Sequence, residues 1–276
     1  MSEKFPRSAE LPSQSPLFWV EQKDRYLRQL LIRDIQDQTK RRLVVYFANR
    51  YERAEIDSRD SALMAEALGD LNGEPVDLLL ETIGGQTDAT EALISLVQST
   101  VKDLRVVVAN AAKSNGTLLC LASKCIVLGA TSELGPIEPS VQGIPCSVLE
   151  QPQVAAQNFA LHMAGKYALQ QTRTLAKTLL ETGMMKDKTA EEIADTVDLL
   201  ASRKKYHSHG SVISHREAKA IGLAVEYLPP DDLLWQRLWL LYSMYDFDCR
   251  KSRYLKVFEG QARSTAIAAP PQPAAP

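Results

Sequence analysis

Apolar residues follow two alternating patterns over the first half of the chain. Short runs rich in Val, Leu and Ile predict strands, and longer segments with apolar residues at helical spacing predict amphipathic helices. The predicted strands cover residues 43–49, 76–82, 105–112 and 124–130, and the predicted helices cover residues 27–38, 61–71, 88–100 and 116–123. Strands that are apolar throughout are typical of a parallel sheet with helices on both faces. The pattern therefore predicts an α/β fold with a mainly parallel sheet.

The second half of the chain is mostly compatible with helix, from about residue 153 to residue 202. Thr189 and Glu192 have the spacing of a capping box, in which each side chain accepts a hydrogen bond from the other residue's main-chain N–H. Ser214 and Glu217 repeat this spacing. Each pair predicts the start of a helix, and a strand-like segment follows the second helix.

Residues 231–258 predict one long helix near the C-terminal end. Trp235, Leu238, Trp239 and Tyr242 form an apolar stripe at helical spacing along it. A stripe of this kind usually packs in the core or against another subunit. We therefore expect it to serve packing rather than ligand binding.

Both ends differ in composition from the rest of the chain. Residues 1–16 are polar and rich in Pro and Ser, and residues 261–276 end in a Pro/Ala segment. Such sequences bury too little apolar surface to offset the entropy that is lost on folding. We expect two disordered ends around one domain, residues 17–260, which is within the size of a single hydrophobic core.

The composition is that of a soluble globular protein. The 276 residues include 32 Lys+Arg and 34 Asp+Glu, and the net charge of -2 argues against a nucleic-acid partner. We find no apolar run that could span a membrane and no apolar segment of a signal peptide in the opening residues. The four cysteines have neither the spacing of a metal motif nor that of a disulfide framework. These features predict a cytoplasmic protein with reduced thiols and no membrane span.

Gly84 and Gly85 form a turn between a predicted strand and a predicted helix. Open α/β sheets bind ligands at the carboxyl ends of their strands, where this turn lies. Glycines let the backbone turn sharply and leave N–H groups bare at a helix N-terminus, where they can bind an oxyanion or a phosphate. A tight turn without any ligand can have the same sequence, so the turn alone leaves both interpretations open.

Ser114 lies in a second turn of this kind, after the predicted strand 105–112. A serine at a strand-to-helix junction can be a nucleophile, because its hydroxyl is exposed and the following N–H groups face the oxygen of the group that it attacks. Serine is also a preferred helix N-cap. The residues alone leave the nucleophile and the cap as alternatives.

Several motifs occur in a fixed order along the chain: the two glycine-bearing turns, the segment 132–141 and the segment 209–223. In this order they resemble the ClpP/crotonase-fold serine peptidases, and most closely the serine dehydrogenase proteinase (SDH_sah) family, which is related to signal peptide peptidase A. The resemblance covers residues 43–227. It implies a ClpP/crotonase-like spiral of βαβ units with a helical C-terminal region that packs between the subunits of a homo-oligomer.

The resemblance also implies an activity. The chain would be a serine endopeptidase that forms an acyl-enzyme with unfolded protein or peptide substrates and needs no cofactor or metal. Ser114 would be the nucleophile, the N–H groups of Gly85 and Asn115 would form the oxyanion hole, and Gly84 would contact the substrate.

The general base that the resemblance implies is a lysine. No histidine lies between Ser114 and His162, whereas ClpP itself has a histidine soon after its serine. Relatives with a Ser-Lys dyad take a lysine from the helix that follows the segment 132–141, which makes Lys166 the first candidate and Lys177 the second. A lysine must be neutral to act as a base, and burial can lower its pKa from about 10.4. Small apolar residues flank Lys166, which suits burial.

Two positions depart from the family pattern. The first loop of the family commonly reads Thr-Pro-Gly-Gly, where this chain has Ile83 in place of proline, and the nucleophile turn commonly has Gly or Ala, where this chain has Asn115. The loss of proline makes the loop less preorganised, and asparagine adds bulk beside the oxyanion hole. Lys113 could assist Ser114 electrostatically, although consecutive side chains usually point apart.

Other polar residues have structural explanations. His207, His209 and His215 could suggest zinc, but no carboxylate or cysteine has matching spacing, so we predict no metal site. Glu138 is expected to fix its own turn. Two other functions fit the same fold: a crotonase-type acyl-CoA enzyme, and a catalytically weak or inactive oligomeric scaffold.

Overall fold

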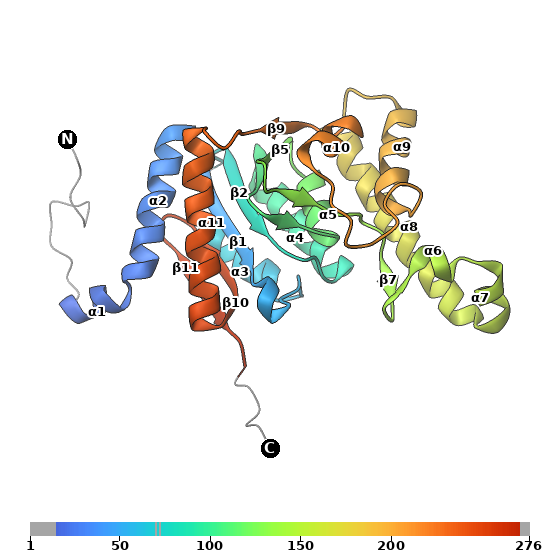
Figure 1. The fold of residues 1–276 in the computed structure, drawn as a ribbon, viewed down its shortest axis with the longest axis horizontal. Coiled ribbons are helices and arrows are strands. Elements are labelled where there is room, and N and C mark those ends of the chain that lie inside the picture. The colour runs from blue at the N-terminus through green and yellow to red at the C-terminus, as the bar shows by residue number, and fades with distance from the viewer. Residues whose placement is uncertain (1–14, 70, 72, 271–276) are drawn as a thin grey trace, which may run out of the picture.

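The computed structural model describes residues 15–69, 71 and 73–270 as a mixed α/β fold (Figure 1). Its centre is a seven-stranded sheet in the order β11-β10-β1-β2-β3-β5-β9. The strands β1, β2, β3, β5 and β9 are parallel, and β10 and β11 extend the sheet as an antiparallel ribbon. The sheet strands are β1 (Arg42–Ala48), β2 (Val76–Glu81), β3 (Leu104–Val108), β5 (Cys125–Leu128), β9 (Val225–Tyr227), β10 (Tyr254–Glu259) and β11 (Ser264–Ala268). The predicted α/β class with a mainly parallel sheet is confirmed.

Helices cover both faces of the sheet. Because successive parallel strands are added in one direction, right-handed crossovers place the connecting helices on the same face. That face carries α3 (Asp60–Leu68), α4 (Thr87–Thr100), α5 (Asn115–Leu121), α8 (Phe159–Thr182) and α9 (Ala190–Ala201). The opposite face carries α2 (Lys23–Thr39) and α11 (Leu233–Ser252), which lie side by side (Figure 1).

Shorter elements complete the described chain. The short helices are α1 (Pro16–Glu21), the 3-10 helix η1 (Arg50–Glu52), α6 (Cys146–Leu149), α7 (Pro152–Gln157) and α10 (His215–Ala220). The short strands are β4 (Ala111–Ala112), β6 (Glu133–Leu134), β7 (Ser140–Val141) and β8 (Ile144–Pro145). Figure 1 shows α6, α7 and the nearby turns of α8 at the side of the molecule that is farthest from α2.

Side chains alternate between two hydrophobic clusters along the parallel strands. On β1, Val44 and Tyr46 pack with the helices of one face, while Val45 and Phe47 pack with α2 and α11 on the other. Successive strand residues point to opposite faces, so an unbroken apolar run supplies both clusters at once. This two-sided burial is what the apolar strands of the sequence predicted.

The predicted helix starts at two capping boxes are confirmed. Thr189 accepts a hydrogen bond from the N–H of Glu192 at the start of α9, and Ser214 does the same for Glu217 at the start of α10. In both cases the glutamate side chain accepts the reciprocal bond from the capping residue's N–H. These local signals succeed because each is complete within four residues.

The C-terminal region differs from the prediction of one long helix. Helix α11 ends at Ser252, and Arg253 takes the left-handed conformation with a φ of 52°. The chain then turns into β10, which pairs with β1 and gives the edge of the parallel sheet a partner for its main-chain groups. The predicted disordered segment 261–276 is therefore wrong in its first part, because Ser264–Ala268 forms strand β11.

The remainder of that tail, residues 271–276, lies outside the described residues, as do residues 1–14 of the predicted N-terminal disordered segment. Ser15 accepts a hydrogen bond from the N–H of Phe18 and caps α1.

The apolar stripe of α11 is only partly buried. Trp235, Leu238 and Tyr242 are buried, whereas Trp239 is 36% exposed. In the described part of the chain, no helix combines the length and apolar character needed to cross a membrane.

Candidate active site

Ser114 lies between strand β4 and helix α5 in an unusual backbone conformation. Its φ is 53° and its ψ is -118°, a region that non-glycine residues rarely adopt. It precedes α5, yet its side chain makes no capping hydrogen bond. The helix-cap interpretation of this serine is therefore wrong. Strained serines on strand-to-helix turns are typical of nucleophile elbows, where the strain exposes the hydroxyl.

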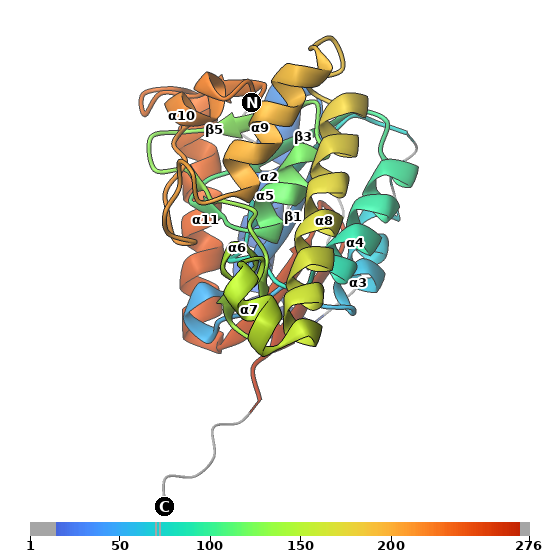
Figure 2. The same ribbon diagram turned by 90° about the vertical axis from the view of Figure 1, so that its right-hand side faces the viewer.

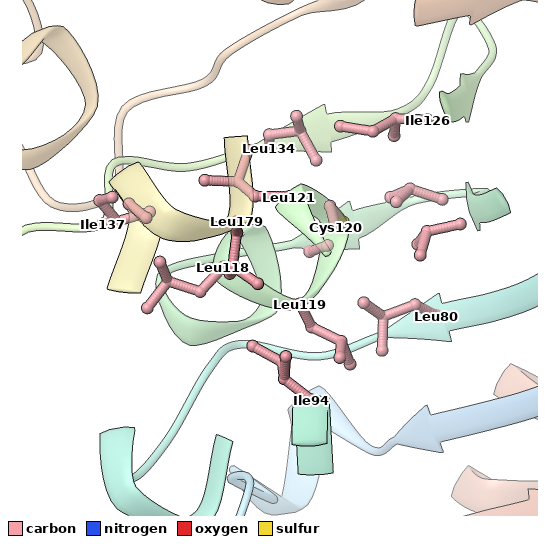
Figure 3. Close-up of a cluster of buried hydrophobic side chains, with 14 of the residues drawn as sticks. Leu80, Ile94, Leu118, Leu119, Cys120, Leu121, Ile126, Leu134, Ile137 and Leu179 are labelled. Carbon is pink, nitrogen blue, oxygen red and sulfur yellow. The ribbon is translucent and has the colours of Figure 1, made fainter. Parts of the chain in front are cut away.

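Helix α5, which follows Ser114, is surrounded by the core. Its residues from Asn115 to Leu121 are all buried. Figure 3 shows its leucines extending toward Leu80 of β2, Ile94 of α4 and Leu179 of α8. A helix packed on every side cannot shift without opening cavities. The packing therefore fixes the position of the turn that carries Ser114.

The turn at Gly84 lies directly against the turn of Ser114. A Cβ added to Gly84 would lie 2.8 Å from the Cβ of Ser114 and 2.9 Å from the carbonyl oxygen of Lys113. Gly84 also has a φ of 102°, which disfavours any side chain. The close approach and the positive φ both require glycine at position 84. The two turns that the sequence predicted as parts of the site are therefore in direct contact.

The orientation of the neighbouring peptide is set by a third segment. The carbonyl oxygen of Gly84 accepts a hydrogen bond of 2.8 Å from the N–H of Ile56, and the N–H of Gln86 donates to the carbonyl oxygen of Ile56 at 3.0 Å. In a planar trans peptide the N–H points away from the C=O. The N–H of Gly85 is therefore directed away from Ile56.

Two main-chain donors are available beside Ser114. Among the described residues, we find no hydrogen bond from the N–H of Gly85 or from the N–H of Asn115, which is the first residue of α5. The first N–H groups of a helix have no partner within the helix and carry partial positive charge. Gly84, in contrast, uses both of its main-chain groups, since its N–H donates to Thr82 Oγ1 at 3.0 Å.

Glu81 and Thr82, at the end of β2, support both turns, and the sequence analysis did not identify them. Glu81 is buried, and its carboxyl group accepts hydrogen bonds from the N–H of Ala111 and the side chain of Asn110, each at 2.9 Å. The carbonyl oxygen of Thr82 accepts a hydrogen bond of 3.0 Å from the N–H of Lys113. A charged residue that ends an apolar strand was the available signal in the sequence.

Lys113 precedes Ser114 but is engaged elsewhere. Its Nζ lies 3.1 Å from Glu133 Oε2 and donates to the carbonyl oxygens of Leu134 and Ser211 at 3.1 and 3.2 Å. Three acceptors use the three donors of an ammonium group. Lys113 therefore links the nucleophile turn to two neighbouring segments and has no free donor for catalysis.

Both candidate bases lie on helix α8, which packs against α5 (Figure 2). Lys166 is exposed, in the third of α8 that is nearer to α7. Lys177 is also exposed and lies 3.6 Å from Glu181 in a surface ion pair. Within the described chain, neither lysine forms a hydrogen bond with Ser114. The structure thus brings Ser114, Gly85 and Asn115 together and leaves both lysines in solvent.

The chain was compared with models of known protein families. Residues 23–252 match the family model described as "ClpP-like SDH-type serine proteinase". The chain belongs to this family. The resemblance inferred from the order of the motifs is confirmed, and so is the ClpP-like fold class. Family membership also supports a peptidase function for the chain.

Two curated relatives come from Methanocaldococcus jannaschii. The chain is 28% identical over 167 residues to uncharacterized protein MJ0137 and 27% identical over 157 residues to uncharacterized protein MJ1495. The matches cover 58% and 55% of this chain and 56% and 52% of those proteins. The chain therefore spans about half the length of the curated relatives that it matches.

Among solved structures, the chain is similar to a mutant of ClpP1 from Listeria monocytogenes. The two chains superpose with a TM-score of 0.46 and 14% sequence identity, and the match covers 72% of this chain and 98% of that one.

The family segments that follow the nucleophile turn are held by ion pairs and strand contacts. Glu138 is buried and accepts hydrogen bonds from the N–H of Ser147 at 3.0 Å and from Nε of Arg203 at 2.8 Å, which is the turn-fixing role expected of it. Leu134 and Ile213 exchange two main-chain hydrogen bonds of 3.0 Å. These contacts join the segment 132–141 to the loop that contains His209.

The histidines near this loop each interact with different groups rather than with one another. His207 lies 2.8 Å from the carbonyl oxygen of Arg203, and His215 stacks on Tyr227. His209 is exposed, and the pKa of its ring is lowered by partial desolvation and by the positive charges of Arg203 and Lys113, against the attraction of Glu138. Across the described residues, no three potential ligands gather as a metal site would require.

Proposed function

We propose that the chain is a serine endopeptidase in which Ser114 attacks the carbonyl carbon of a peptide bond. The observation that carries the proposal is the combination of a strained, uncapped serine with two unused N–H donors beside it. In the proposed reaction, the N–H groups of Gly85 and Asn115 stabilise the oxyanion of the tetrahedral intermediate. Donors that are fixed before the reaction need no reorganisation as the charge develops.

Lys166 is the proposed general base. It would accept the proton of the Ser114 hydroxyl during attack and return it to the amine that leaves, which yields an acyl-enzyme. Water would then attack the ester carbonyl carbon and give a proton to the amine of Lys166. The ester C–O bond would break, and Lys166 would return the proton to Oγ of Ser114 as the acid product leaves. Lys177 stays the second candidate, because it lies on the same helix and is exposed as well.

The proposed role of Lys166 requires a covering surface. A lysine accepts a proton only in its neutral form, and burial favours that form. Two large apolar side chains of the same helix are also exposed, Phe159 at 68% and Tyr167 at 62%. Contact of this part of α8 with a second copy of the chain would bury these side chains and remove water from Lys166. We therefore propose a homo-oligomer whose assembly completes the active site.

Substrates and location follow from the same proposal. The groups proposed to act are side chains and main-chain amides, so the reaction calls for no cofactor, and the proposed substrates are unfolded proteins or peptides. We place the protein in the cytoplasm because of its composition. Gly84 is proposed to contact the substrate only through van der Waals contact, because both of its main-chain polar groups are used.

Labelling with a fluorophosphonate probe tests the proposal. The wild type should be labelled once on Ser114, Ser114→Ala should not be labelled, and Lys166→Ala should be labelled at least tenfold more slowly, given the usual contribution of a general base. Ser99→Ala is the matched control and should be labelled like the wild type. Slower labelling of Lys177→Ala than of Lys166→Ala would make Lys177 the base. Equal labelling of Ser114→Ala and wild type would overturn the proposed nucleophile.

One observation favours a second candidate function. In the described chain, no side chain that could act as a base forms a hydrogen bond with the hydroxyl of Ser114. In a catalytically silent oligomeric scaffold, Ser114 would lack a base in the assembled protein as well. The scaffold hypothesis predicts an oligomer that neither reacts with the probe nor cleaves unfolded casein. A crotonase-type enzyme would also ignore the probe, but it would bind coenzyme A.

A further inference from the structure

The side chain of Asn115 connects the two turns of the candidate site. It is 6% exposed, and its Nδ2 donates a hydrogen bond to the carbonyl oxygen of Gly85. The same nitrogen lies 3.4 Å from Oγ1 of Thr87, at the start of α4. Asn115 thus links the first residue of α5 to the glycine loop, which is about thirty positions earlier in the chain.

The glycine loop is held from two sides as a result. On one side, Ile56 exchanges main-chain hydrogen bonds with Gly84 and Gln86 at 2.8 and 3.0 Å. On the other side, Asn115 binds the carbonyl oxygen of the residue between them. A Cβ on Gly85 would lie 2.3 Å from main-chain atoms of Ile56, so the loop is also in close contact there. The orientation of the Gly85 N–H depends on both contacts.

The two departures from the family pattern lie on either side of this contact. Ile83 replaces the proline that would restrict the loop, and Asn115 replaces a residue with no hydrogen-bonding side chain. Proline preorganises a loop by removing backbone freedom from it. A buried hydrogen bond to a loop carbonyl also limits the backbone freedom of the loop, because it fixes the orientation of that carbonyl group.

We infer that the Asn115 side chain is a positioning residue that preorganises the glycine loop of this chain and so compensates for the missing proline. Its main-chain N–H and its side-chain amide have different tasks: the first faces the developing oxyanion, and the second holds the loop that carries the other donor. This inference rests on the proposed function, because it concerns the geometry of the same oxyanion hole.

Replacing the side chain while keeping the main-chain N–H tests the inference. Asn115→Ala should reduce the rate constant of fluorophosphonate labelling by about tenfold to a hundredfold, since displacement of a reacting group by about 1 Å has effects of this size. The affinity for the probe should change much less than the rate constant. Gln86→Ala is the matched control, because this exposed side chain of the same loop makes no hydrogen bond among the described residues.

A second variant distinguishes positioning from general loss of structure. Ile83→Pro should be tolerated, because Ile83 has a negative φ and no hydrogen bond from its N–H is present among the described residues. Thr82 before it pairs as a strand residue, which suits a following proline. In the double variant, Ile83→Pro should restore at least part of the labelling rate that Asn115→Ala loses.

Hydrogen exchange gives a readout that needs no catalysis. In Asn115→Ala, main-chain amides of residues 83–87 should exchange several-fold faster, while those of α5 stay protected. Unchanged exchange and an unchanged labelling rate would overturn the inference, as would a double variant that labels no faster than Asn115→Ala. If the wild type itself does not react with the probe, the proposed function fails, and the exchange measurement still decides whether Asn115 orders the loop.

Discussion

Glu81 accepts a hydrogen bond of 2.9 Å from the main-chain N–H of Ala111, three residues before Ser114. The carboxyl group lies on the opposite face of the sheet from helix α5, near Arg50, Tyr242 and Asp246. Burial raises the pKa of Glu81 to about 7, against the effect of its two hydrogen bonds, which favour the charged form. A titratable group therefore supports the strand end that leads to the nucleophile turn.

The stability of the protein should depend on the ionisation of Glu81. Its pKa is about 7 in the folded chain and 4.5 in an unfolded one. Between these values the folded state keeps a proton that the unfolded state releases, so the contribution is fully present below pH 4.5 and is lost as pH rises through 7. Urea unfolding at several pH values should show this fall, by about 3 kcal/mol, and Glu81→Gln should lack it.

Glu191→Gln is the control for this measurement, because Glu191 is an exposed residue of α9. It should leave the dependence of the unfolding free energy on pH unchanged. If the wild type and Glu81→Gln lose the same amount of stability between pH 5 and pH 8, the ionisation of Glu81 does not cause the loss and the prediction is wrong.

Most of the parallel sheet could be predicted from the sequence, since strands β1, β2, β3 and β5 are apolar runs whose side chains enter both clusters. The predicted helix 231–258 includes residues 254–258 of strand β10 for an identifiable reason. Lys256 interrupts its apolar pattern, although the side chain is 2% exposed and pairs with Asp60. A lysine looks like a surface residue until its distant partner is known.

The candidate site shows the same limit. Gly84, Gly85, Ser114 and Asn115 lie in turns that local sequence can predict. Ile56, which orients the Gly85 peptide, belongs to an irregular segment whose pairing depends on the assembled fold. The exposure of the candidate lysines likewise depends on packing, because helical spacing does not specify which face a neighbouring subunit covers.

The backbone strain at Ser114 predicts a stability difference between two variants. Both Ser114→Gly and Ser114→Ala remove the hydroxyl, but only glycine adopts a φ of 53° without strain. We expect Ser114→Gly to be more stable than Ser114→Ala by about 1 kcal/mol in denaturant unfolding. Ser99 lies in the exposed part of helix α4, where glycine disfavours the helix. At this position we expect Ser99→Gly to be less stable than Ser99→Ala. The same order at both positions would show that Ser114 is unstrained.

The buried ion pairs of Lys256 predict a large effect of mutation. Its Nζ lies 2.7 Å from Asp60 Oδ1 and 2.8 Å from Asp57 Oδ2, and Tyr46 donates a hydrogen bond of 2.6 Å to Asp60. Lys256→Met leaves a buried carboxylate without its cation and should destabilise the protein by about 3–5 kcal/mol. Lys188→Met removes the exposed pair with Glu192 and should cost less than about 0.5 kcal/mol. Similar costs for the two variants in urea unfolding would contradict this interpretation of β10.

The contact between Gly84 and Ser114 predicts that a single methyl group disturbs the site. A Cβ at position 84 would lie 2.8 Å from the Cβ of Ser114, so Gly84→Ala must push one turn away from the other. We expect the rate of fluorophosphonate labelling to fall by about a hundredfold.

Gly143→Ala is the matched control for this variant. Gly143 also has a positive φ, 76°, but a Cβ there would have no atom within 4 Å. It should therefore cost only the backbone strain of an L-residue, about 1 kcal/mol, and should keep the wild-type labelling rate. A Gly84→Ala variant that reacts as fast as Gly143→Ala would mean that the two turns can separate without consequence for the hydroxyl, and that their contact does not define the reactive geometry.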